Sequence, residues 1–175
     1  LVHWSLFVFF NLPEGCSELI TFLFQEEVHG KQQRPNLSTE RLQNALRTSA
    51  PHCLRYLVAG IIIGKRRSTY KLRDLSKVLE SEIDVYHDPV TEFLRCLFCD
   101  LNFLKAREHL EACQEVLEND FFFQGEHGKE NKALFMKNAK LQLFETYCRI
   151  HKVVDLKMVA NLMMFEEDDK LEEKV

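Results

Sequence analysis

Apolar side chains recur every three or four residues along most of the chain, which is the spacing of one face of an α-helix. The pattern is clearest after Asp88 and Pro89, where the apolar positions are Val90, Phe93, Leu94, Leu97 and Phe98. Asp88 can cap such a helix, and proline suits a first turn because the amide proton that it lacks would have no partner there. The hydrophobic pattern therefore predicts an all-α fold.

The next apolar segment predicts a partner for that helix. Its apolar positions alternate steps of three and four residues and are Phe103, Ala106, Leu110, Cys113 and Leu117. Such a narrow seam is typical of one helix packed against another, and Ala106 is small enough to let the partner approach. Further helices are predicted over residues 1–10, 14–24, 40–48, 51–63 and 68–82. Because paired helices recur without a fixed-period consensus, we expect an array of structural helix hairpins.

The end of the chain predicts a different kind of unit. Polar segments at 25–40 and 124–132 are predicted as loops. Residues 138–150 then form a long helix whose apolar stripe is Leu141, Phe144 and Cys148, widened by Leu143, Tyr147 and Ile150. Val153 and Val154 favour an extended step. Asp155 can cap a short second helix, on which the apolar residues are Leu156, Val159, Ala160 and Met163. This order of elements is how a winged-helix subdomain begins.

Four blocks of sequence carry a resemblance to a known family, namely LVHWSLFVFFN at 1–11, DPVTEF at 88–93, VLENDFF at 116–122 and LFETYCRIH at 143–151. In this order they resemble the e subunits of eukaryotic translation initiation factor three. Members of that family carry a PCI domain, a helical-repeat and winged-helix module that also occurs in the proteasome lid and the signalosome. The resemblance implies a right-handed helical-repeat array over residues 1–137 and the truncated start of a winged helix over 138–175.

The same resemblance implies a function. A member of this family would be a non-catalytic scaffold in the cytoplasm that binds other subunits of the initiation factor. Through the complex it would contact the small ribosomal subunit and support recruitment of messenger RNA. We expect the winged-helix interface to include Leu156, Val159 and Met163. The alternatives are a scaffold of the signalosome or proteasome lid, and a winged-helix module that binds nucleic acid itself.

The charge distribution argues against direct binding of nucleic acid. The 175 residues carry a net charge of −4, and residues 165–175 account for all of it with six acidic residues and two lysines. The balanced remainder has no general attraction for a phosphate backbone. The basic cluster Lys65, Arg66 and Arg67 could contact RNA or an acidic partner, although a solvated turn is the more ordinary interpretation.

Motifs for catalysis, metals or cofactors are incomplete in this sequence. The segment from Gly60 to Lys65 has three residues between its glycines, and Arg66 stands where a phosphate-binding loop needs Ser or Thr. We predict a buried helix that ends near Gly64 in the left-handed conformation. Cys96 and Cys99 form a CxxC without a second pair, which favours a structural thiol pair. We therefore predict a protein without enzymatic activity, cofactor or metal.

The remaining composition agrees with this interpretation. The six cysteines lie in apolar helical patterns without a signal peptide, which predicts reduced thiols in a cytosolic protein. The chain starts at Leu1 inside an apolar run, which indicates a fragment of a longer polypeptide. Its apolar stretches are far shorter than the ~20 residues of a membrane span. Trp4 and most of the 14 phenylalanines lie at core spacing, so we expect them inside, with a partner-binding groove as the alternative.

Overall fold

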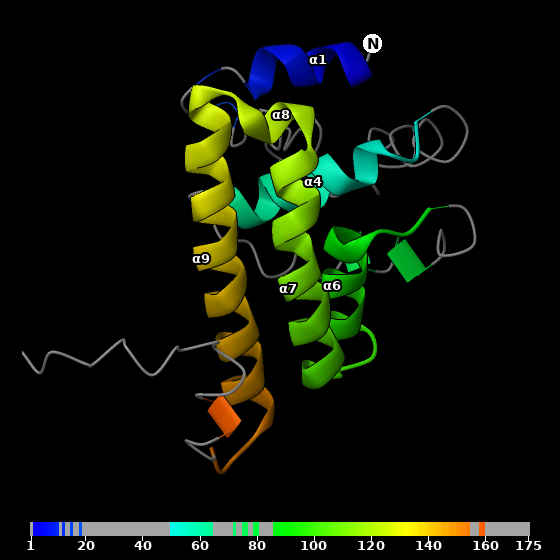
Figure 1. Cartoon of the computed structure of the whole chain (residues 1–175). Coiled ribbons are helices and arrows are strands. Elements are labelled where there is room, and N and C mark those ends of the chain that lie inside the picture. The colour runs from blue at the N-terminus through cyan, green and yellow to red at the C-terminus, as the bar shows by residue number, and fades with distance from the viewer. Residues whose placement is uncertain are drawn as a thin grey trace, which may run out of the picture.

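Helices make up the regular structure of the chain in a computed structural model that describes residues 2–10, 12, 15, 18, 50–64, 72, 75, 76, 79, 80, 86–154, 158 and 159 (Figure 1). The helices that are described over their whole length are α1 (Val2–Phe9), α4 (Cys53–Ile63), α6 (Pro89–Phe98), α7 (Phe103–Asn119), α8 (Phe121–Gln124) and α9 (Glu126–Ile150). Within the described residues there is no strand, and the all-α prediction is confirmed there. The handedness of the array, the boundary after residue 137 and the winged helix stay predictions.

The hairpin of α6 and α7 forms as predicted (Figure 1). At the start of α6, Asp88 Oδ1 accepts a hydrogen bond from the Thr91 amide at 3.0 Å, and Thr91 Oγ1 accepts one from the Asp88 amide at 2.9 Å. This reciprocal capping satisfies two amide groups that the helix itself leaves unpaired. The side chain of Asn102 caps α7 with a single hydrogen bond, accepting from the Lys105 amide at 3.1 Å. The seam of α7 is buried at Ala106, Leu110, Cys113 and Leu117.

The predicted loop at residues 124–132 is wrong, because α9 starts at Glu126 and runs through this segment. Gly128 has low helix propensity and lies in a polar segment without an apolar stripe, so the local sequence favours a loop. Tertiary packing overrides that preference. A Cβ atom at position 128 would lie 2.6 Å from the backbone carbonyl carbon of Phe123, so glycine is what allows α9 to approach α8.

The buried face of α9 is offset from the predicted stripe. Leu141, Phe144 and Cys148 are only half-buried, and Ile150 is exposed. The buried positions of this helix are Phe135, Ala139, Gln142, Leu143, Thr146 and Tyr147, together with Gly128 and Asn131 near its start. Gln142 and Thr146 are polar, and Gln142 donates to Thr146 Oγ1 at 3.4 Å. This polar pair weakens the apolar signal of the true face, so the sequence alone favours the neighbouring one.

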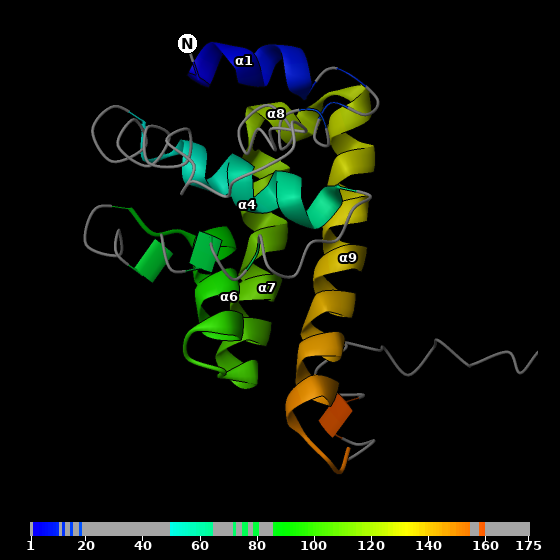
Figure 2. The same ribbon diagram turned by 180° about the vertical axis from the view of Figure 1, so that it is seen from behind.

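Helix α4 crosses the bundle and packs against α6 and α9 (Figure 2). All its residues except Arg55 are buried, which is typical of a helix enclosed by its neighbours. The predicted end near Gly64 is confirmed, but the predicted left-handed conformation is wrong, since Gly64 has φ −54° and ψ 138°. Asn138 of α9 instead donates to the Ile62 carbonyl at 2.9 Å and so satisfies one of the carbonyl groups that a helix end leaves free.

Helix α1 lies beside α8 at one end of the bundle in both views (Figures 1 and 2). Its inner residue Leu6 and the adjacent Phe10 are buried. The ring of Phe10 lies 5.2 Å from that of Phe123 and 5.5 Å from that of Tyr56. Leu72, Leu75 and Leu79 of the predicted 68–82 helix are helical and buried. The predicted helices at 14–24 and 40–48 and the loop at 25–40 lie outside the described residues, apart from isolated positions.

Candidate interaction surface

Arg55 joins the beginnings of two helices. Its Nε donates to Asp88 Oδ2 at 2.5 Å, and its terminal nitrogen NH1 donates to Asp120 Oδ2 at 2.9 Å. Asp88 caps α6, and Asp120 caps α8 by accepting from the Phe122 amide at 3.0 Å. The two aspartate side chains are only 8% and 3% exposed. The guanidinium of Arg55 on α4 therefore neutralises two buried carboxylates, each of which caps the N-terminus of another helix.

Two tyrosines complete this polar network. Tyr86 donates to Asp88 Oδ2 at 2.6 Å, and Tyr56 donates to Asp120 Oδ2 at 2.9 Å. Burial raises the pKa of both phenols, and their acidic partners raise it further, so both stay protonated donors at neutral pH. Burial alone would lower the pKa of Arg55, but its hydrogen bonds to Asp88 and Asp120 outweigh that effect and raise it. All the charged groups of this network are hydrogen-bonded. We call the network the Arg55 joint, because it fixes α4, α6 and α8 relative to one another.

Above this joint lies an exposed group of apolar side chains, which we call the aromatic end surface: Trp4, Phe7 and Val8 of α1, and Phe121 of α8. Trp4 is 70% exposed and Phe121 is 69% exposed, so the expectation that Trp4 lies in the core is wrong. The rings of Trp4 and Phe7 stack at 5.7 Å, and Phe7 lies 5.9 Å from Phe121. Contiguous exposed aromatic residues are typical of surfaces that other molecules cover.

The base of this surface is held by ring contacts between helices. Phe7 meets Phe122 edge to face at 4.9 Å, and Phe122 meets Tyr56 at 5.2 Å. Through Tyr56 the surface is continuous with the Arg55 network. Because the aromatic residues rest on rings that are fixed by hydrogen-bonded partners, the surface is presented on a rigid support.

Two histidines lie at its edge. The ring nitrogens Nε2 of His52 and Nδ1 of His3 are 3.2 Å apart, which links the N-terminal end of α4 to α1. Burial, the neighbouring His3 and Arg55 lower the pKa of His52. Protonation of His52 is therefore disfavoured in the folded chain, and the contact requires at least one neutral ring.

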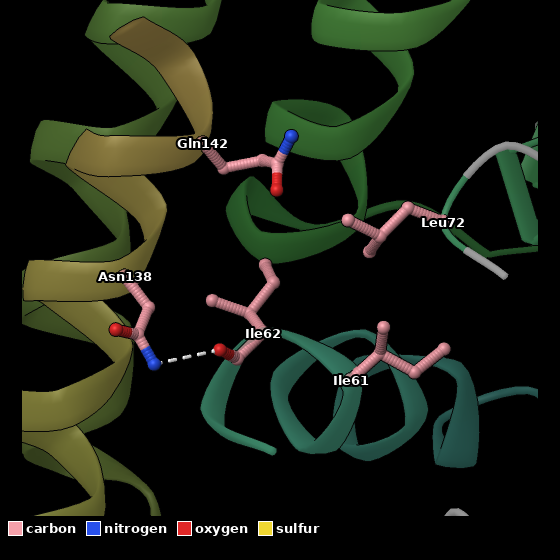
Figure 3. A pocket seen from close by; sticks show the side chains of 5 residues that line it. All are labelled: Ile61, Ile62, Leu72, Asn138 and Gln142. Atoms are coloured by element: carbon pink, nitrogen blue, oxygen red, sulfur yellow. Dashed lines mark hydrogen bonds between the residues drawn. The ribbon is translucent and has the colours of Figure 1, made fainter. Parts of the chain in front are cut away.

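A small cavity lies between α4, α9 and Leu72, and is lined by Ile61, Ile62, Leu72, Asn138 and Gln142 (Figure 3). Its volume of about 10 Å³ is at the lower limit for a single water molecule. The side chain of Asn138 points to the Ile62 carbonyl, as Figure 3 shows. A cavity of this size cannot bind a substrate or a cofactor.

Most of the site residues that we expect from the sequence lie outside the described residues. Lys65, Arg66, Arg67, Leu156 and Met163 are not among the described residues. Val159 is described and half-buried, and it packs against the core. None of the helices in the described part of the chain is long and apolar enough to span a bilayer.

The described cysteines are free thiols. Burial raises the pKa of Cys113 and Cys96, so each favours its protonated form. Cys96 and Cys99 do not act as a pair, because the thiol of Cys99 donates to the Ser76 carbonyl at 3.6 Å, whereas that of Cys96 faces Asp100 at 3.9 Å.

Comparison with known proteins finds relatives named as the E subunit of eukaryotic translation initiation factor 3. The one from Caenorhabditis briggsae is 38% identical over 169 residues, which are 97% of this chain and 49% of the relative. Those from Caenorhabditis elegans and Culex quinquefasciatus are 38% and 37% identical over 97% of the chain, and 35% and 34% of their own length is covered. The chain is homologous to these E subunits. No protein-family model matches it.

This homology confirms the resemblance that the four blocks of sequence indicate, although the chain spans only a third to a half of the length of these relatives. In the structure, two of the blocks that resemble the E subunits contain Asp88 and Asp120, the carboxylates that Arg55 joins. A third contributes the core residues Leu143 and Tyr147 of α9. These three blocks therefore cap helices and fill the core, whereas the first block, together with Phe121, contributes the aromatic end surface.

Proposed function

We propose that this chain is a non-catalytic scaffold segment of a subunit of translation initiation factor 3. The observation that carries the proposal is the match to the E subunits of that factor over 97% of the chain. A subunit by definition assembles with other chains. We propose that its partners are other subunits of the same factor and, through the complex, the small ribosomal subunit in the cytoplasm, where it supports recruitment of messenger RNA.

The aromatic end surface is the proposed contact with a second protein of the complex. Aromatic side chains are enriched at the centres of protein interfaces, and tryptophan is prominent among the residues that contribute most to binding. Trp4 and Phe121 are both about 70% exposed, and the rings beneath them are fixed. A partner that covers them gains apolar burial without ordering a flexible loop of this chain.

Two further contacts remain proposals from the sequence. We propose that Leu156, Val159 and Met163 form an edge that pairs with another PCI subunit. We propose that the basic cluster Lys65, Arg66 and Arg67 is a solvated turn. The alternative is that it contacts RNA or an acidic partner. Replacement of the three basic residues by alanine distinguishes these two cases, because a solvated turn leaves assembly unchanged.

A scaffold of the signalosome or proteasome lid is the closest rival, and a direct nucleic-acid binder is a rival of another class. The proteins that match this chain carry the name of the initiation factor, which favours the first proposal. The balanced charge of residues 1–164 gives no general attraction for a phosphate backbone, which disfavours the last.

Affinity purification of the tagged natural protein from nuclease-treated cell extract tests the proposal. Mass spectrometry should identify initiation factor 3 subunits in fixed ratio to the bait, and a preparation that carries the tag alone should not contain them. Subunits of the proteasome lid or signalosome in their place would contradict the assignment. Association with nucleic acid alone, lost after nuclease treatment, would do the same.

A further inference from the structure

Three potential metal ligands from two helices converge between α6 and α7. Glu92 and Cys96 lie one turn apart on α6, and His109 comes from α7, which runs alongside it (Figure 1). One ligand atom from each residue lies within 4.8 Å of the other two. Cys96 is fully buried, whereas Glu92 and His109 are half-buried, so the group opens to solvent on one side.

Glu92 and His109 have ligand atoms available, and the sulfur of Cys96 makes only long contacts of 3.9 Å with Arg95 and Asp100. Arg95 donates to Glu92 at 3.0 Å and 2.8 Å, but both hydrogen bonds end on Oε2 and leave Oε1 without a hydrogen bond among the described residues. His109 likewise has no hydrogen-bond partner in the described part of the chain. Arg95 also donates to Asp100 at 2.7 Å, and this contact keeps its charge paired when Glu92 turns toward a cation.

We propose that Glu92, Cys96 and His109 bind a zinc ion that joins α6 to α7. Thiolate, imidazole and carboxylate are the donors that zinc prefers, and three protein ligands leave a fourth position for water. Zinc–ligand distances of about 2.0–2.3 Å place tetrahedral ligand atoms roughly 3.3–3.8 Å apart. The observed spacing of up to 4.8 Å therefore has to shorten by about 1 Å. Rotation of the half-buried Glu92 and His109 side chains can supply that change.

Binding requires one proton to leave. The sulfur–hydrogen bond of Cys96 breaks, the proton passes to solvent, and the sulfur lone pair forms the bond to zinc. The thiolate and the Glu92 carboxylate then balance the two positive charges of the ion. No change of oxidation state occurs.

The site is hard to find in the sequence because its ligands do not form a local motif. Cys96 and Cys99 look like half of a zinc signature, yet Cys99 bonds to the Ser76 carbonyl and is not in the group. The two ligands of α6 meet His109 only after the chain reverses at the α6–α7 turn. This site is independent of the proposed scaffold function.

Cobalt substitution of the full chain tests the proposal, because a thiolate–cobalt bond gives a charge-transfer absorption band in the near ultraviolet. We expect one equivalent of Co²⁺ to give this band, and Zn²⁺ to displace it. Cys96→Ser should abolish the band. His109→Gln, at a half-buried position, should weaken zinc binding at least tenfold while circular dichroism shows an unchanged helix content. Cys99→Ser is the matched control and should retain both the band and the affinity.

Several results would overturn the site. A band that persists in Cys96→Ser, or that disappears in Cys99→Ser, would place the thiolate elsewhere. Zinc affinity that is unchanged in a folded His109→Gln protein would remove the imidazole from the site. Absence of the band in the wild-type chain at one equivalent of Co²⁺ would reject thiolate ligation altogether.

Discussion

Arg55 donates to Asp120 at 2.9 Å across 65 positions of the sequence, and so connects the middle of the chain to the start of α8. The same guanidinium binds Asp88, which caps α6. The helices that support the aromatic end surface therefore share one charged joint. If this joint is lost, two carboxylates remain buried without their cation, and desolvation of an unpaired charge is costly.

The first prediction concerns this joint. Arg55→Met removes the charge but keeps a long apolar side chain, and should lower the free energy of unfolding by about 3–5 kcal/mol because Asp88 and Asp120 stay buried. Lys132→Met is the matched control: Arg55 and Lys132 are each 24% exposed, but the partner of Lys132, Glu118, is 51% exposed. Urea denaturation should show little change for the control. Equal stability of the two variants would mean that the joint is not critical.

The second prediction tests the close approach of α8 and α9. Gly128→Ala raises helix propensity, but its Cβ would meet the Phe123 backbone at 2.6 Å, so overpacking should lower stability by about 1–3 kcal/mol. Gly125→Ala introduces a Cβ with nothing within 4 Å, so it adds no clash, and its expected cost is only the difference between glycine and alanine at an N-cap. Thermal melts of both variants measure the difference. A stabilised Gly128→Ala protein would show that the two helices are further apart.

The third prediction concerns the α6–α7 seam. Leu110 is fully buried, and Leu110→Ala should cost about 2–5 kcal/mol through lost contacts and the cavity that remains. Leu104 is 50% exposed on the same helix, so Leu104→Ala should have a much smaller effect. The comparison is made by chemical denaturation, and similar losses at both positions would contradict the register of α7.

The fourth prediction is a pH dependence. The pKa of His52 in the folded chain is lowered from 6.5, chiefly by burial and then by His3 and Arg55. The unfolded chain therefore binds the proton more tightly, and the His52 contribution to stability is complete above the unfolded pKa of 6.5 and decreases as pH falls below it. Melting midpoints between pH 8 and pH 5 should fall more steeply for wild type than for His52→Gln. Parallel curves would show that His52 titrates alike in both states.

Local signals in the sequence predict some elements of this fold well. Asp88 and Pro89 mark the start of α6, and the apolar spacing of α7 identifies its buried seam, because capping and periodicity act between near neighbours. The start of α9 is not predicted because glycine disfavours a helix locally. The contact between Gly128 and α8 that requires a glycine there is not visible in the sequence. The predicted face of α9 is displaced because Gln142 and Thr146 are buried despite their polarity.

The candidate surface is less accessible to sequence analysis. Trp4 and Phe7 have the spacing of core residues, and only the packing of α1 on α8 decides which side faces solvent. The role of Arg55 depends on aspartates 33 and 65 positions later, and no local pattern encodes such pairs. Asp120 before three phenylalanines is a visible capping signal for α8, but its partners are not visible.

Quantitative co-purification with a surface variant tests whether the aromatic end surface holds the chain in the complex. The tagged natural protein with Trp4→Ser and Phe121→Ser is compared with wild type and with Leu104→Ser, an exposed leucine away from the aromatic end surface. We predict that the double variant keeps the wild-type melting midpoint but recovers at least tenfold less of the other initiation factor 3 subunits, whereas Leu104→Ser recovers normal amounts. Normal recovery by the double variant would contradict the proposed contact, and a lowered melting midpoint with normal recovery would show that the surface is covered by the protein's own polypeptide.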